Sequence, residues 1–178
     1  MRLHKLSIFL VIVFTIIIIG CKKEVKSNVA MLNFQNQKYN FSFSYPSGWE
    51  EVNRDLPEKW AILDKDKNTI LFIVNKASGK DLRSLGMSQA VRDIYPSKKL
   101  AELTKDDLKN ILQVFRLDSF NNRSWYTYGI KFSDKNVESL IAGTLCGENE
   151  VMVVLVSDYK SFDKNKETYK NILNMFKC

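Results

Sequence analysis

Apolar and polar positions divide this chain into one unbroken apolar stretch and a patterned remainder. Residues 6–19 are apolar except for Ser7 and Thr15, and they follow a short basic start. As a helix, these 14 residues would cover about 21 Å, less than the ~30 Å hydrocarbon layer of a membrane. An apolar core of this length behind a basic start is typical of an export signal. We therefore expect residues 1–20 to form a signal peptide.

Alternating apolar and polar positions predict strands in the first and last thirds of the remaining chain. Aromatic residues alternate with small polar ones from Tyr39 to Tyr45, so one face of that strand should be buried. Residues 60–63 and 70–74 flank a polar loop and should form a hairpin whose second strand is buried on both faces. The other predicted strands are 125–132, 137–145 and 151–156. The last is entirely apolar, so we expect it at the centre of the sheet.

Apolar residues at helical spacing predict three helices. The first should end before Pro96, the second begins with a capping-box-like Thr104–Asp107 segment, and the third is capped by Ser161 or Asp163. Their inward-facing residues are Met87, Val91, Ile94 and Tyr95; then Leu108, Ile111, Leu112 and Phe115; then Tyr169, Ile172, Leu173 and Phe176.

Residues 22–37 are polar with scattered apolar positions and show no sustained periodicity. We interpret residues 21–37 as a flexible tether and residues 38–178 as a single domain. Sixteen flexible residues span on the order of 20–25 Å, enough to lift a domain off a membrane.

The end of the apolar stretch carries a candidate modification site. Ile18-Ile19-Gly20-Cys21 resembles a bacterial lipobox, in which the cysteine is acylated, the peptide is cut before it, and the cysteine becomes the lipidated N-terminus. The alternative is an ordinary secretory signal or a short signal anchor with an incidental cysteine. We expect acyl chains on Cys21 to hold the protein on the extracytoplasmic face of a bacterial membrane, inner or outer, with membrane lipid as its first partner.

Composition narrows the chemistry of the mature domain. The net charge of +7 falls to +5 without the signal, which favours anionic lipid or envelope polymer over nucleic acid as a partner. The only histidine, His4, lies in the signal. A Ser-His-Asp or Cys-His catalytic site and a histidine-ligated zinc are therefore excluded. Cys146 and Cys178 are too few for a four-cysteine metal centre, and we expect neither a metal nor a cofactor.

Two groups of side chains are candidates for a binding surface. Trp49 and Trp60 could rim a groove that binds sugars or peptides, or they could fill the core. Lys164, Lys166 and Lys170 crowd one face of the last helix together with Lys160. That face could bind an acidic partner or simply be solvated.

Carboxylates suggest two further sites, each with a simpler interpretation. Asp64, Asp66 and Asn68 alternate as in a calcium loop, but the glycine and glutamate of the EF-hand pattern are missing, so a solvated hairpin loop is expected. Glu148 and Glu150 could form a carboxylate pair, yet both should lie in an exposed turn.

Element lengths bring the last two cysteines together. A strand over residues 151–157 would run about 23 Å, and a helix over residues 163–177 about the same length. If the helix packs antiparallel to the strand, Cys178 returns to the turn beside Cys146. A disulfide between them in an oxidising compartment and two free thiols both remain open.

Two motifs resemble a known family. Phe43-Ser44-Tyr45-Pro46-Ser47-Gly48-Trp49 resembles the opening turn of the PsbP/Mog1-like family, which includes PsbP-like and DcrB-like lipoproteins, and residues 170–177 resemble its closing helix, with Met175 in place of the usual serine. The resemblance spans about residues 39–177. It implies an α/β fold of the α+β type, with a mainly antiparallel sheet and packed helices, that serves as a docking platform.

We therefore expect a non-catalytic binding or docking module for an envelope or membrane protein. A carrier or sensor of a small ligand is the alternative, and an enzyme of unknown type ranks third.

Overall fold

The structure is a computed structural model that describes residues 30–52, 58–64 and 66–178. The predicted signal peptide, Cys21 and the first part of the tether lie outside these ranges. No helix within the described ranges is long and apolar enough to cross a membrane.

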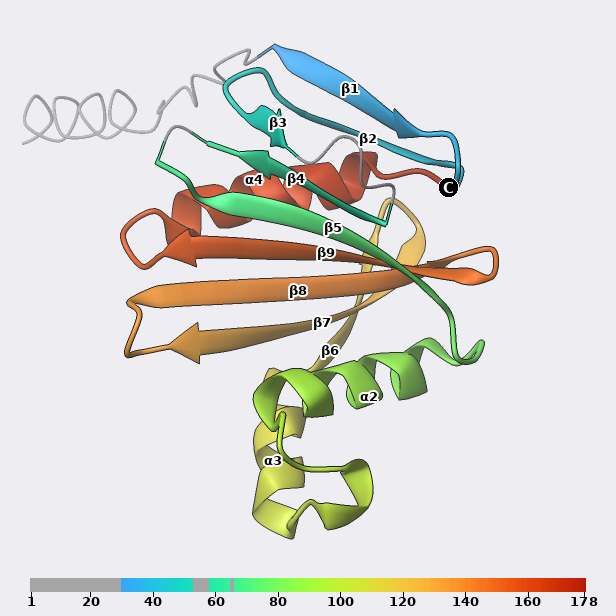
Figure 1. Cartoon of the computed structure of the whole chain (residues 1–178), viewed down its shortest axis with the longest axis vertical. Helices are drawn as coiled ribbons and strands as arrows, with labels where there is room; N and C mark the ends of the chain where they lie inside the picture. Colours follow the sequence, from blue (N-terminus) through green and yellow to red (C-terminus); the bar gives the residue numbers. More distant parts are fainter. Residues whose placement is uncertain (1–29, 53–57, 65) are drawn as a thin grey trace, which may run out of the picture.

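The domain is organised around one antiparallel sheet of seven strands (Figure 1). In spatial order the strands are β3 (Glu50–Val52), β4 (Lys59–Leu63), β5 (Thr69–Lys76), β9 (Asn149–Asp158), β8 (Val137–Cys146), β7 (Arg123–Phe132) and β6 (Arg116–Phe120). The apolar run of β9 lies in the middle, paired with β5 on one side and β8 on the other. Its predicted central place is therefore confirmed, as are the fold class and the β4–β5 hairpin. β5 is fully buried on one face only, however, because Leu71 and Ile73 on its other face are half-buried.

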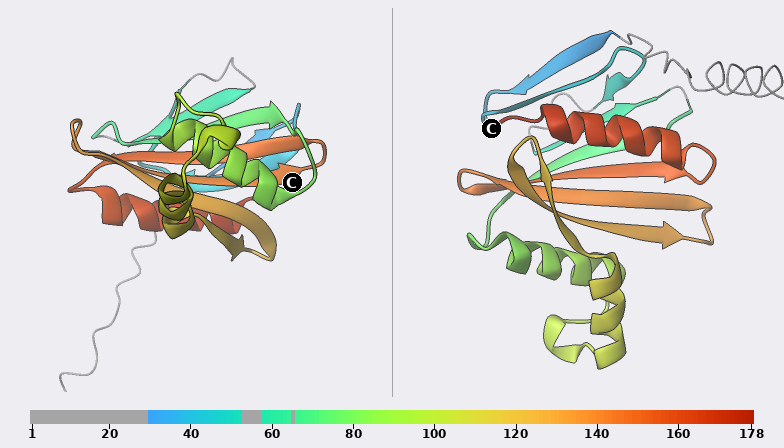
Figure 2. Two further views of the ribbon diagram at one scale, coloured as in Figure 1. Left: turned by 90° about the horizontal axis from the view of Figure 1, so that it is seen from below. Right: turned by 180° about the vertical axis from the view of Figure 1, so that it is seen from behind.

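One face of the sheet is covered by α4 (Phe162–Met175) and by a separate hairpin of β1 (Met31–Asn36) and β2 (Phe41–Pro46). Figure 2 shows α4 running along the strands on that face. β2 turns Phe41, Phe43 and Tyr45 into the core, as its alternation predicts. The Phe43 ring stacks on Phe72 of the sheet with centroids 4.1 Å apart. This aromatic layer is the larger of two apolar cores.

The opposite face is covered in part by α2 (Leu82–Ile94), with α3 (Lys105–Val114) beyond the sheet's edge and a short 3-10 helix, η1 (Leu100–Glu102), between them. The capping box of α3 is formed: the Thr104 hydroxyl accepts from the Asp107 N–H, and the Asp107 carboxylate accepts from the Thr104 N–H. Both helices lie where the apolar spacing predicts them. Leu112 of the predicted interior stripe is instead 51% exposed, because α3 contacts the domain along a narrower face.

The tether interpretation is wrong for residues 31–36, which form β1. β1 pairs along its whole length with β2, and its Phe34 ring stacks on Trp60 with centroids 3.9 Å apart. Met31 and Leu32 are both exposed, so the strand shows no regular alternation that sequence could detect.

Candidate functional site

Of the two interpretations of Trp49 and Trp60, the structure supports the core and not the rim of a groove. They are 8% and 3% exposed and belong to the aromatic core. Trp60 is enclosed by Phe34 and by the edge of Phe43, whose ring centroid lies 5.1 Å away. Their role is packing under the β1–β2 hairpin.

The lysines of α4 lie on its outer face, as the helical spacing predicts. Lys164 is exposed, whereas Lys166 and Lys170 are half-buried. Lys170 Nζ lies 3.0 Å from Glu167 Oε1, one turn earlier. The face therefore mixes both charges, which favours a solvated surface over a site for an acidic partner.

The Asp64–Asn68 loop is a structural turn and not merely a solvated one. The Asp64 carboxylate accepts hydrogen bonds of 2.9 Å from the N–H groups of Asp66 and Asn68. Asn68 is buried, and its Oδ1 accepts from Ser157 Oγ at 2.9 Å and from the Asp158 N–H at 3.1 Å. These bonds tie the turn to the end of β9. Across residues 30–52, 58–64 and 66–178 no cluster of side chains has the make-up of a metal site.

Glu150 is buried in β9, so its expected place in an exposed turn is wrong; Glu148 does lie exposed in the turn. The Tyr126 hydroxyl donates to Glu150 Oε1 at 2.8 Å, and the Tyr128 hydroxyl donates to the Asp93 carboxylate. Burial, and then the nearby carboxylates, raise the pKa of both tyrosines far above the usual value. Both phenols therefore stay protonated and act as hydrogen-bond donors. The cluster that they form with Glu150 and Asp93 has a packing role beneath α2.

Glycines on two elements make room for Tyr126. A Cβ on Gly86 of α2 would lie 2.4 Å from Tyr126 Cγ, and one on Gly143 of β8 would lie 2.1 Å from its Cζ. Only glycine fits at either position without displacing the ring.

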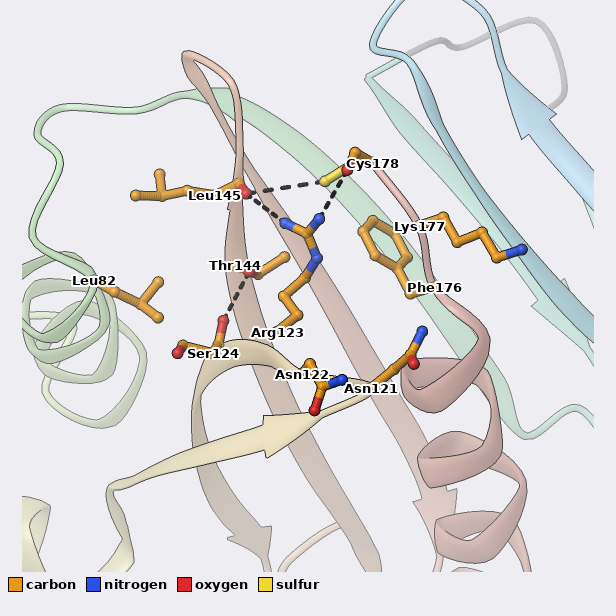
Figure 3. Close-up of a pocket in the computed structure, with 10 residues that line it drawn as sticks. All are labelled: Leu82, Asn121, Asn122, Arg123, Ser124, Thr144, Leu145, Phe176, Lys177 and Cys178. Atoms are coloured by element: carbon orange, nitrogen blue, oxygen red, sulfur yellow. Dashed lines mark hydrogen bonds between the residues drawn. The ribbon is translucent and has the colours of Figure 1, made fainter.

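A polar cleft of about 570 Å³ opens where the β6–β7 hairpin meets the C-terminal segment (Figure 3). Its lining residues are Leu82, Asn121, Asn122, Arg123, Ser124, Thr144, Leu145, Phe176, Lys177 and Cys178. Arg123 bridges the two walls, donating from Nη1 to the Leu145 carbonyl at 2.9 Å and from Nη2 to the Cys178 main-chain oxygen at 2.8 Å. Arg123 therefore holds the C-terminal segment against the end of β8.

Cys146 and Cys178 meet at the edge of this cleft. Their sulfur atoms are 1.99 Å apart, at bonding distance, and their Cα atoms 5.6 Å apart. α4 does return along β9, which brings the two residues together as the element lengths predict. The bond ties the end of the chain to the end of β8.

An apolar hollow of about 290 Å³ lies between α2 and the neighbouring part of the sheet face. Its lining residues are Leu71, Ile73, Gln89, Asp93, Ile130, Phe132, Ser139, Ile141, Met152 and Val154.

A second exposed apolar feature lies at the junction of α3 and β6. Leu112, Val114 and Leu117 are between 40 and 51% exposed and fall within six residues of one another. We name these three residues the α3–β6 patch. The sequence does not predict this patch, because the pattern of β6 does not indicate a strand. The signal that could have found β6 is Asn121-Asn122, whose positive φ angles of 49° and 60° form the two-residue turn of a hairpin.

An antiparallel sheet with α4 and a β-hairpin on one face and α2 on the other defines an α+β domain of the PsbP-like class. The chain belongs to the PsbP family, whose model matches residues 30–178. The expected family resemblance is thus confirmed.

Solved structures agree on the fold. Cyanobacterial PsbP (CyanoP) from Synechocystis sp. PCC 6803 has a TM-score of 0.55 and 15% identity over 89% of this chain and 97% of that chain. A crystal structure from Bacteroides thetaiotaomicron has a TM-score of 0.52 and 12% identity over 78% of this chain and 44% of that chain. No curated protein matches the chain.

Proposed function

We propose that this protein is a lipid-anchored, non-catalytic docking module on the extracytoplasmic face of a bacterial membrane, with a strand of an envelope protein as its partner. The observation that carries the proposal is the α3–β6 patch beside the edge of the sheet. The chain also belongs to the PsbP family, and the resemblance to that family implies a docking platform, which supports the proposal. The lipobox-like Cys21 supplies the anchor.

Backbone pairing makes the edge at β6 a suitable acceptor for a strand. In the described part of the chain β6 pairs only with β7. Phe120 and Arg123 close the two-residue turn, and ladder bonds alternate along an antiparallel pair. The N–H and C=O groups of Leu117 and Ser119 therefore point away from β7, toward any strand that joins the sheet.

Side chains along this edge define the chemistry of the partner. Leu117 is half exposed, and the exposed Arg116 and Asp118 stand on either side of it. Cross-strand neighbours of opposite charge stabilise an antiparallel pair. We infer a partner strand with an apolar residue opposite Leu117, an acidic residue opposite Arg116 and a basic residue opposite Asp118.

The test is site-specific photo-crosslinking in intact cells from position 117, with a probe at Lys99 as the control. We expect an adduct from position 117 alone that maps by mass spectrometry to an extracytoplasmic strand of one envelope protein. Ser119→Pro removes an edge N–H and should abolish the adduct, whereas Ser119→Ala should retain it. Equal labelling from Lys99, an adduct composed only of this chain, or an adduct unaffected by Ser119→Pro would overturn the proposal.

A second candidate function is the carriage or sensing of a small anionic ligand, favoured by the polar cleft around Arg123. Lys177 adds a second cation to its lining, and none of the described residues that line it has an acidic side chain. Phosphate or citrate should then raise the midpoint of thermal unfolding. Lys177→Gln should weaken this effect, and the α4 control Lys170→Gln should not. No shift with either anion would remove this candidate.

A further inference from the structure

Four exposed apolar side chains lie at the same end of the strands. Seven large apolar side chains are exposed within the described ranges: Met31, Leu32, Leu112, Val114, Leu117, Phe132 and Tyr159. Three of them are the α3–β6 patch. The other four come from three segments that are far apart in sequence but reach the same end of the sheet.

Strand register places these segments together. Phe132 at the end of β7 pairs with Val137, and Val137 pairs with Asp158, next to Tyr159. At the same end, β1 starts at Met31, opposite Pro46, and the chain from Pro46 leads directly into β3. Figure 1 shows these segments along the left side of the molecule, where the strands end, with the C-terminus on the right side. We name this the entry end, because the described chain enters the domain there.

Hydrogen bonds join neighbouring segments of the entry end in two groups. The Tyr159 N–H donates to the Asn136 carbonyl at 3.4 Å, and Asn68 is bonded to Asp158 as described above. The Ser47 N–H donates to the Ala30 carbonyl at 2.9 Å, which fixes where the chain enters. These hydrogen bonds therefore hold the segments that carry the exposed side chains in place.

The segment between Cys21 and Ala30, the first described residue, is short. Eight residues lie between Cys21 and Ala30, so the nine steps along the chain reach at most about 32 Å. If Cys21 is acylated, as the proposed function requires, the tether brings the entry end to the head groups of the bilayer.

We propose that the entry end is a membrane-docking surface whose occupant is the lipid interface, with Phe132 and Tyr159 at the level of the head groups. Tyrosine, whose aromatic ring carries a polar hydroxyl, favours that level. Lys135 Nζ lies 6.0 Å from the centre of the Phe132 ring, and Lys160 follows Tyr159, so cationic groups flank both rings.

Charged side chains of both signs lie at the entry end. The exposed Asp66 and Asp134 lie in the same loops as Lys67 and Lys135, so neither sign dominates. Docking therefore depends on the apolar side chains and only weakly on anionic lipid. It also orients the domain, leaving the Arg123 cleft and the disulfide on the side away from the bilayer.

The experiment uses the mature acylated protein reconstituted in vesicles of phosphatidylcholine, with and without phosphatidylglycerol. Environment-sensitive fluorophores are attached at Phe132→Cys or Tyr159→Cys, with Glu148→Cys at the opposite end as the control. Nitroxide lipids labelled near the head group should quench the first two probes at least about twofold and leave the third unchanged, in both lipid mixtures. Equal, weak quenching at all three positions would overturn the inference.

Hydrogen exchange of backbone amides tests the same docking without a substitution at Phe132 or Tyr159. Amides of residues 132–136 and 158–161 should exchange more slowly in the vesicle-bound acylated protein than in soluble Cys21→Ala protein, whereas those of residues 147–148 should not. Unchanged exchange would contradict docking. Intact mass separates the two proposals: an unmodified Cys21 overturns both, whereas acylation with water-exposed probes overturns only this one.

Discussion

The hydroxyl of Tyr126 donates a 2.8 Å hydrogen bond to Glu150, a carboxylate with only 5% of its surface exposed. Within the described ranges no cation forms a salt bridge with Glu150. A buried carboxylate without an ion pair depends on its hydrogen-bond donors. The bond between β7 and β9 therefore secures the sheet beneath α2.

Removing the donor should destabilise the protein more than neutralising the acceptor. Tyr126→Phe leaves the carboxylate buried without this donor, which costs about 1–3 kcal/mol. Glu150→Gln keeps a carbonyl oxygen for Tyr126 to bond and should cost less. Urea unfolding measures both, and Tyr126→Phe within about 0.5 kcal/mol of the parent would contradict the assigned role.

The two glycines beside Tyr126 should not tolerate a methyl group. Gly86→Ala and Gly143→Ala each force the ring to move, and overpacking of this kind costs about 1–3 kcal/mol or more. Gly79→Ala is the matched control, because nothing lies within 4 Å of its added Cβ. Thermal unfolding should show a loss for the first two variants only. Equal midpoints for all three would contradict the packing seen around Tyr126.

Asp107 should make stability depend on acid pH. Hydrogen bonds from Lys98, and then from Thr104, lower the pKa of Asp107 from 3.8 to about 2. Because the folded pKa lies below the unfolded one, the ionised group stabilises the fold above about pH 4, and this contribution is lost as the pH falls toward 2. Urea midpoints measured from pH 6 to pH 2 should therefore converge for the parent and Asp107→Asn. A constant difference across that window would contradict the assignment.

Cys146 and Cys178 should be alkylated only after reduction. Opening a loop with a sequence separation of 32 residues should lower the free energy of unfolding by about 3–4 kcal/mol. Intact mass with and without reductant checks the bond, and denaturation under both conditions checks its effect. Mass addition by an alkylating agent without reductant would show free thiols. The Cys146→Ser, Cys178→Ser double variant should match the reduced protein.

Sequence predicted the elements whose burial follows a regular period. β2 has one wholly buried face, β9 contains the unbroken apolar run 151–156, and α3 begins with a complete capping box, so each leaves a clear pattern. β6 was missed because Arg116–Ser119 are all exposed, so neither face of the strand carries an apolar signal. β1 was missed for the related reason that only Phe34 and Asn36 turn inward.

The candidate sites were harder to predict because they depend on tertiary pairing. Glu150 was assigned to an exposed turn, and only the position of Tyr126 across the sheet explains its burial. Trp49 and Trp60 were difficult to place for a different reason: on sequence alone, a large aromatic side chain fits either a groove or a core. The proximity of Cys146 and Cys178 could be foreseen because it follows from element lengths. The α3–β6 patch could not, since it required knowing which edge of the sheet stays open.

The central position of β9 has a consequence for how the chain reaches its final state. β5 ends at Lys76, yet its second neighbour begins only at Asn149, so its partner is more than seventy residues later in the chain. Pairings this distant slow folding, because a long loop must close before the contacts form. Until residues 149–158 arrive, the apolar edge of β5 is open to strands of other molecules. The first half of this protein therefore has to be kept from aggregating until nearly the whole chain is available.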